Sequence, residues 1–183
     1  VVYSNTSGYA GGIAGHSSAN FVNCANSASI TGYMAGGIDG YSIGNYALGF
    51  RYCTNTGYIS GTSSAAGIVS YGQSAIFRCV NKGTISGSGA GGIAYFSGIK
   101  TSECVNYGKV SATGTGSSNN CGGIVGNSLN PVIDCYNMGT INSKGTVGGI
   151  VCYSQGIIKN CYDAGTLTKP TSTSTWEPGG IFG

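Results

Sequence analysis

The chain has few charged residues, and it contains a single histidine, a single tryptophan and only three prolines. Charged side chains make up 7% of the 183 residues, against roughly 25% in an ordinary globular domain. The eight basic residues form no run, so the charge pattern does not indicate a surface for nucleic acid or for an anionic membrane. No apolar stretch approaches the roughly 18 residues of a membrane-spanning helix, and we therefore expect no membrane insertion.

Helix-forming residues are scarce as well. Leu, Glu and Lys are few, and glycine interrupts every short segment, which argues against a helical solenoid. The 35 glycines do not recur at every third position, so a collagen triple helix is excluded. An apolar fraction of 40% argues against disorder, because enough Ile, Val, Tyr and Phe remain to form a core.

What the chain does have is a repeat. A step of two small residues followed by Ile occurs seven times, and a Cys follows six of these steps, eleven residues after the Ile in five of the six copies. A fixed period of this kind, here 25–31 residues, is the signature of a repeat architecture. The Ile residues of the steps are Ile13, Ile38, Ile68, Ile93, Ile124, Ile150 and Ile181.

The second half of each repeat reads Cys-x-Asn-x-Gly-x-Ile in its commonest form. Short apolar alternations such as residues 132–135 and 149–151 predict strands of three to five residues separated by Gly and Asn turns. Three such strands, wound in one direction, make one coil of a parallel β-helix. The sequence thus predicts an all-β fold: one single-stranded β-solenoid domain over residues 1–183, with about six coils of three short strands each.

Equivalent residues of successive coils are expected to stack about 4.8 Å apart, which is the spacing between strands. Three apolar columns would then fill one narrow core. A column of amides is expected at a corner, where each side chain bonds the turn backbone and the next amide, and where the Gly two residues later supplies a positive φ. The members of this column are Asn26, Asn55, Asn81, Asn106, Asn137 and Asp163.

The six repeated cysteines form a further column. We interpret them as a ladder of buried free thiols, because parallel side chains on in-register strands are poorly aimed at one another, although the Cα spacing alone leaves a disulfide open. The sequence contains no Cys-x-x-Cys motif and no column of His or carboxylates beside the cysteines, so we expect neither a metal site nor another cofactor. Cys121 and Cys152 lie outside the ladder, at different places on neighbouring coils, and are not expected to bond. The ladder consists of Cys24, Cys53, Cys79, Cys104, Cys135 and Cys161.

The repeat resembles the GLUG-motif family. The best copy is Gly122-Gly123-Ile124-Val125-Gly126-Asn127, followed by the closing segment from Asp134 to Ile141. The resemblance covers nearly the whole chain. It implies a large bacterial secreted or cell-surface protein, and it supplies no catalytic residues. The chain begins and ends within a repeat, without an initial Met, and we expect it to be a segment of a longer polypeptide.

Aromatic residues offer candidate binding groups. A column three residues after each repeated Ile contains mostly rings, which either present a surface for glycans or pack at a corner of the coil. The only tryptophan lies in the last of three insertions, where either a contact role or a capping role fits. The candidate binding residues are Tyr41, Tyr71, Phe96, Tyr153 and Trp176.

Only five carboxylates are available for enzyme chemistry. Glu103 and Asp134 each precede a ladder cysteine, and Arg78 is next in the same column. Two close carboxylates can perform acid–base catalysis, but an exposed charge column explains the same residues. We therefore expect no enzymatic activity and no catalytic residue.

These observations favour a non-enzymatic structural segment, either a rigid stalk or a fibre-forming unit, in an extracellular or cell-surface bacterial protein. End-to-end self-association is expected, because both ends of a solenoid expose strand edges and no polar cap is evident. The alternative is an adhesin that binds a glycan or a host surface protein through the aromatic column and the inserted loops. A polysaccharide-active enzyme is the least favoured alternative.

Overall fold

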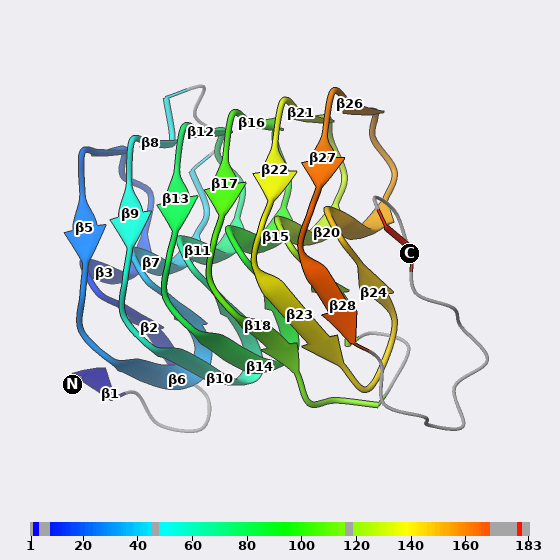
Figure 1. Ribbon diagram of the computed structural model, residues 1–183. Helices are drawn as coiled ribbons and strands as arrows, with labels where there is room; N and C mark the ends of the chain where they lie inside the picture. The colour runs from blue at the N-terminus through cyan, green and yellow to red at the C-terminus, as the bar shows by residue number, and fades with distance from the viewer. Residues whose placement is uncertain (1, 4–7, 45–47, 116–118, 169–178, 181–183) are drawn as a thin grey trace.

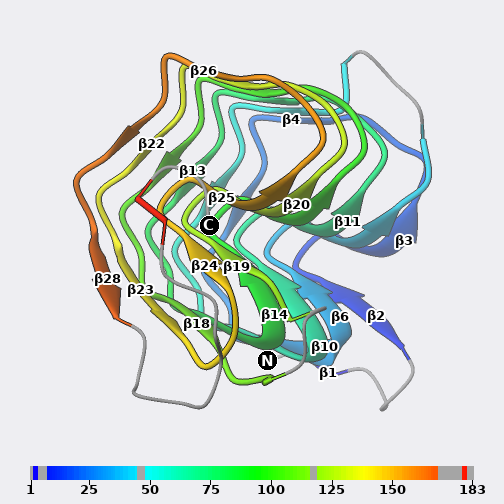
Figure 2. The ribbon, with the colours of Figure 1, turned by 90° about the vertical axis from the view of Figure 1, so that its right-hand side faces the viewer.

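The computed structural model describes residues 2–3, 8–44, 48–115, 119–168 and 179–180. Within these ranges every element is a β-strand, and the strands stack in parallel into a solenoid of about six coils (Figure 1). Seen along its axis, the solenoid shows its coils nested over one another (Figure 2). The predicted all-β solenoid is therefore confirmed. The described ranges contain no helix that is long and apolar enough to cross a membrane.

The largest sheet follows one side of the solenoid. In the central coils it consists of the long strands β6 (Ile30–Gly36), β10 (Ile59–Ala66) and β14 (Ile85–Gly91). Pairing is in register, so that Ile59 lies between Ile30 and Ile85. In the other coils the sheet contains the shorter strands β1 (Val2–Tyr3), β2 (Tyr9–Gly11), β18 (Val110–Ala112), β19 (Cys121–Gly122), β23 (Thr140–Ser143), β24 (Val147–Gly148) and β28 (Thr166–Thr168).

Three six-stranded sheets complete the coils. The second sheet holds β3 (Ala14–Ser17), β7 (Asp39–Ser42), β11 (Val69–Gly72), β15 (Ala94–Ser97), β20 (Val125–Ser128) and β25 (Val151–Ser154). The third holds β4 (Phe21–Val22), β8 (Phe50–Arg51), β12 (Ile76–Phe77), β16 (Thr101–Ser102), β21 (Val132–Ile133) and β26 (Ile158–Lys159). The fourth holds β5 (Ala25–Asn26), β9 (Thr54–Asn55), β13 (Val80–Asn81), β17 (Val105–Asn106), β22 (Tyr136–Asn137) and β27 (Tyr162–Asp163).

A left-handed corner separates the third sheet from the fourth. The residue before each ladder cysteine has a positive φ of 50–56°, so the segment expected as one strand through the cysteine is divided in two. Left-handed backbone is uncommon outside glycine and costs roughly 1–2 kcal/mol per residue. Nothing in the side chains signals this corner, because its members are as different as Asn23, Tyr52, Arg78, Glu103, Asp134 and Asn160.

The glycine two residues after the ladder asparagine, as in Gly57 and Gly83, does not have the positive φ expected from the sequence, and that expectation was wrong. Among the described glycines, only Gly49 has a positive φ, at 41°. Gly57 is required for space instead: a Cβ there would lie 2.0 Å from the carbonyl oxygen of Ala28 in the preceding coil. Gly83 would meet the carbonyl oxygen of Gly57 at the same distance. Tight stacking of coils therefore selects glycine at this column.

The apolar columns fill two cores rather than one. One cluster contains the repeated Ile residues from Ile38 to Ile150, the apolar residues three before the ladder cysteines, and the ladder cysteines themselves. The other contains the Ile30 column packed on small residues such as Ala65 and Ala90. The chain passes from one cluster to the other twice per coil, at the asparagine and at the Gly-Gly step. These two crossings meet, since a Cβ on Gly67 would lie 2.7 Å from the Asn81 amide.

Candidate functional site

The asparagine column is a continuous hydrogen-bonded ladder inside the solenoid. Each side-chain Nδ2 donates to the Oδ1 of the next rung at 2.7–2.9 Å, and the ladder ends on Asp163. Each amide also closes its own turn: Asn81 accepts from the Gly83 N–H and donates to the Gly83 carbonyl, both at 3.1 Å. The central amides are fully buried and fully partnered, which explains how so many polar groups tolerate the interior.

All eight cysteines are free. The four inner ladder thiols are buried, and those of the end coils, Cys24 and Cys161, are half-buried. Thiols of the ladder donate to the carbonyl two residues earlier, as Cys104 does to Ser102 at 3.2 Å. Burial raises the pKa of the Cys104 thiol well above its usual value, so this group is a poor nucleophile. The described residues include no group of three or more His, Cys, Asp or Glu side chains that could hold a metal ion.

Cys121 and Cys152 lie on different strands, β19 and β25, as their offsets in the repeat predict. The fold nonetheless brings them close, because the Cys152 thiol is hydrogen-bonded to the backbone of Cys121. Burial is the main cause that raises the pKa of both thiols, that of Cys152 to about 11. Both are structural and unreactive in the folded state.

Three of the five candidate binding residues form a stack of rings. The Tyr41 and Tyr71 centroids are 4.6 Å apart, the Tyr71 and Phe96 centroids are 4.3 Å apart, and both pairs are parallel within 5°. The stack continues onto Tyr9 rather than onto His16, which is the residue in register with Tyr41. His16 contacts the Tyr9 and Tyr41 rings edge-on. Tyr9 comes from another strand, β2, and no pattern in the sequence identifies it.

Stacking determines what these rings can bind. The faces of Tyr41 and Tyr71 are covered by neighbouring rings, so sugars cannot lie on them and the strip mainly packs the surface of β7, β11 and β15. Phe96 ends the stack, because Asn127 follows it in register. Beside Phe96 is a cavity of about 190 Å³, lined by Tyr71, Gln73, Phe96, Gly98, Ile99 and Leu129.

The other two candidate residues stand apart from the stack. Asn127 separates Tyr153 from Phe96 in the column. The Tyr153 side chain is 47% exposed, and its hydroxyl accepts a hydrogen bond from Gln155 at 3.1 Å. Trp176 lies outside the described residues.

Asp39 is a buried carboxylate that the repeat did not single out. It occupies a core-facing column position that is held by Ala14 and Val69 in the adjacent coils. Its oxygens accept hydrogen bonds from the Ser17 hydroxyl at 2.5 Å and from the Tyr41 N–H at 3.2 Å. Burial raises the pKa of Asp39 from 3.8 to about 6, against the opposing effect of the Ser17 hydrogen bond. The signal in the sequence that could have identified Asp39 is an acidic residue at a repeat position that holds Ala or Val in the adjacent coils.

The charge column on the outer surface is made of local pairs. Arg78 and Glu103 form an ion pair of 2.7 Å, with both side chains substantially exposed. Asp134 accepts a hydrogen bond from Asn160 at 2.9 Å. Each of the two carboxylates thus has a partner at the surface, although such exposed pairs contribute little to stability.

Comparisons of the chain with protein-family models, with curated proteins and with solved structures give no match. The fold and its columns therefore define the class, a parallel β-solenoid with internal asparagine and thiol ladders.

Proposed function

We propose that the chain is a non-enzymatic structural segment, a rigid spacer or fibre-forming unit, of a bacterial secreted or cell-surface protein. The observation that carries this proposal is the unbroken asparagine ladder, which links the six coils along one axis. Bending the solenoid would have to lengthen the parallel hydrogen bonds in the sheets on the outer side of the bend, and stretching it would have to open this buried ladder as well. The resemblance to GLUG-motif repeats supports the bacterial, extracellular setting.

The end coils support self-association. Ile158, Cys161 and Leu167 are only half-buried, whereas their counterparts in the inner coils are fully or almost fully buried. At the other end, Ile13 is 53% exposed, although the Ile residues of inner steps are completely buried. A further coil stacked on these described end coils, from the continuation of the chain or from a second copy of the segment, would cover these side chains.

Electron microscopy of the purified chain over a range of concentrations tests both parts of the proposal. We expect stiff rods that join end to end into filaments. Leu167→Lys should abolish filaments and leave rods, whereas Thr166→Lys, an exposed change on the same strand, should leave filaments unchanged. Rods of one fixed length at every concentration would contradict fibre formation, and a flexible, coiled shape in solution scattering would contradict the spacer.

A second candidate function is adhesion through a saccharide bound at Phe96. The cavity beside this ring combines an aromatic side chain, the exposed Leu129 and the Gln73 amide, which donates to the Tyr71 hydroxyl at 3.2 Å. Such a mixture of apolar walls and few polar groups is typical of ligand pockets. A glycan array should then show neutral sugars bound by the native chain and lost in Phe96→Ala, with Tyr58→Ala, an exposed tyrosine that does not line this cavity, as the control.

A further inference from the structure

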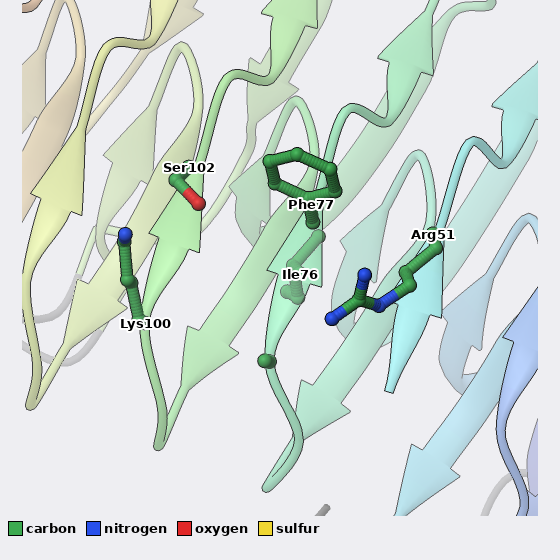
Figure 3. A pocket seen from close by; sticks show the side chains of 6 residues that line it. Arg51, Ile76, Phe77, Lys100 and Ser102 are labelled. Atoms are coloured by element: carbon green, nitrogen blue, oxygen red, sulfur yellow. The ribbon is translucent and has the colours of Figure 1, made fainter. Parts of the chain in front are cut away.

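A second surface, on the third sheet, concentrates positive charge around one aromatic ring. Arg51, Phe77 and Ser102 are stacked in register on β8, β12 and β16. Lys100 is the residue immediately before β16. In Figure 3, Arg51 and Lys100 lie on opposite sides of the strand that carries Ile76 and Phe77. These residues line an open cavity of about 250 Å³ together with Ala75.

The two arginines of the chain both lie against this ring. The guanidinium carbon of Arg51 is 5.4 Å from the Phe77 ring centroid, and that of Arg78 is 4.9 Å from it. Each is held by a further contact: Arg51 Nε donates to the Leu48 carbonyl at 3.1 Å, and Arg78 Nε donates to Glu103 at 2.7 Å. Guanidiniums that are already positioned lose less entropy when a ligand binds.

Positive charge exceeds negative charge at this surface. Among the described residues of this face, four cations stand against two carboxylates, which leaves a net charge of +2: Arg51, Arg78, Lys100 and Lys159 against Glu103 and Asp134. Lys159 stands in the Arg51 column two coils beyond Ser102, after Ile133, and places a further cation along the solenoid axis. In a chain with only 7% charged residues, this is an unusual concentration of cations.

We propose that this surface binds an acidic polysaccharide, with a carboxylate or sulfate group held between Arg51 and Lys100. A planar guanidinium and an ammonium are the side chains best suited to such oxyanions, and the Ser102 side chain lines the same cavity. Because the cations follow the axis over several coils, they match an elongated polymer with repeated negative groups better than a single small anion.

The environment of Phe77 argues for a sugar polymer over a nucleic acid. Proteins that bind single-stranded nucleic acids stack the bases on open aromatic faces. Phe77 does not offer such a face, because it is flanked by two guanidiniums and by the Tyr52 ring, whose centroid is 5.8 Å away. Binding at exposed cations is screened by salt, so the complex should weaken steeply as ionic strength rises.

The test measures binding of the whole chain to polygalacturonate, which carries carboxylates, and to heparin, which carries sulfates. Dextran and a single-stranded oligonucleotide are the neutral and nucleic-acid probes. Isothermal titration at low and at physiological salt should show binding to at least one acidic polysaccharide, and the double change Arg51→Gln with Lys100→Gln should weaken it by roughly tenfold or more.

The matched control is Lys82→Gln with Lys109→Gln, which removes the same charge from exposed lysines outside this cavity. We expect this control to change affinity by less than about twofold. Arg51→Lys should show an intermediate loss, because it keeps the charge and removes the planar fork. Circular dichroism melting verifies that all variants are folded. Absence of binding to both acidic polymers, equal losses in the two double variants, or tighter binding of the oligonucleotide would overturn the proposal.

Discussion

At the scale of single residues, position in the stack decides chemistry more than residue type does. Asp39 is the clearest case, since its neighbours in the column are Ala14 and Val69 and it is fully buried among them. The carboxylate is tolerated because Ser17 and the Tyr41 backbone donate hydrogen bonds to it. Other carboxylates of the chain, such as Glu103, lie on the surface and keep a solvated partner.

The raised pKa of Asp39 predicts a specific pH dependence of stability. Because the folded pKa of about 6 exceeds the unfolded value of 3.8, the native state holds this proton more tightly. The resulting stabilisation is complete below about pH 4 and is lost as the pH rises through about 6, by a total on the order of 2–3 kcal/mol.

Asp39→Asn removes that titration and keeps the shape of the side chain. Urea unfolding should give similar stabilities for the variant and the native chain at pH 4, and a more stable variant at pH 7.5. Glu103→Gln, at an exposed carboxylate, is the control and should show no such pH-dependent gain. A native chain that is as stable as Asp39→Asn at pH 7.5 would contradict a buried carboxylate with a raised pKa.

At the scale of the element, the coil is shaped by close approach between neighbouring coils. The strands on both sides of the corner have only two residues each, yet the corner before each ladder cysteine takes the same left-handed backbone in all six coils. No local preference explains this, because Tyr52 and Arg78 adopt it as Asn23 does. Parallel pairing above and below therefore imposes the corner on whichever residue stands there.

Close approach also predicts the effect of a methyl group at Gly83. Its φ is compatible with alanine, but the new Cβ would lie 2.0 Å from the Gly57 carbonyl oxygen and 2.6 Å from Asn55 Nδ2. Backbone atoms cannot move aside without breaking the asparagine ladder, so Gly83→Ala should destabilise the fold by more than about 2 kcal/mol.

The matched control for this change is Thr84→Ala, at the exposed neighbour. Thermal unfolding of both variants compares them directly. If Gly83→Ala melts at the same temperature as Thr84→Ala, the coils are less tightly stacked at this column than the contact distances require.

At the scale of the whole molecule, the solenoid is a set of continuous columns, and its stability is shared between neighbouring coils. Two hydrophobic clusters run along its length, and the asparagine ladder meets the Gly-Gly steps where the chain crosses from one cluster to the other. Among the described residues the end coils have a full neighbouring coil on one side only, and their cysteines, Cys24 and Cys161, are half-buried.

The burial of the thiols predicts two classes of reactivity. In native buffer at neutral pH, a thiol reagent should label Cys24 and Cys161 slowly and the six buried thiols only as fast as the solenoid unfolds. After unfolding without reductant, the same reagent should count eight thiols. A smaller count would mean that disulfides are present, and fast labelling of Cys104 would mean that its column is open to solvent.

The periodic part of the sequence was sufficient to predict the fold. The Gly-Gly-Ile and Cys-x-Asn-x-Gly segments recur at nearly constant spacing, and stacking at the strand spacing is the arrangement that turns such a repeat into buried columns. The same repeat predicts the register of the aromatic column, in which Tyr41, Tyr71 and Phe96 lie side by side.

The features that break the period could not be predicted, because they depend on contacts between segments at different places in the repeat. Tyr9 joins the ring stack from another strand, and Asp39 finds donors in the coil before it and in its own strand. Repetition alone was thus enough to predict the solenoid and its columns. The double core, the need for space at Gly57 and the position of Arg51 and Lys100 on either side of one ring become visible only in the folded chain, since each depends on distances across the coil or between coils.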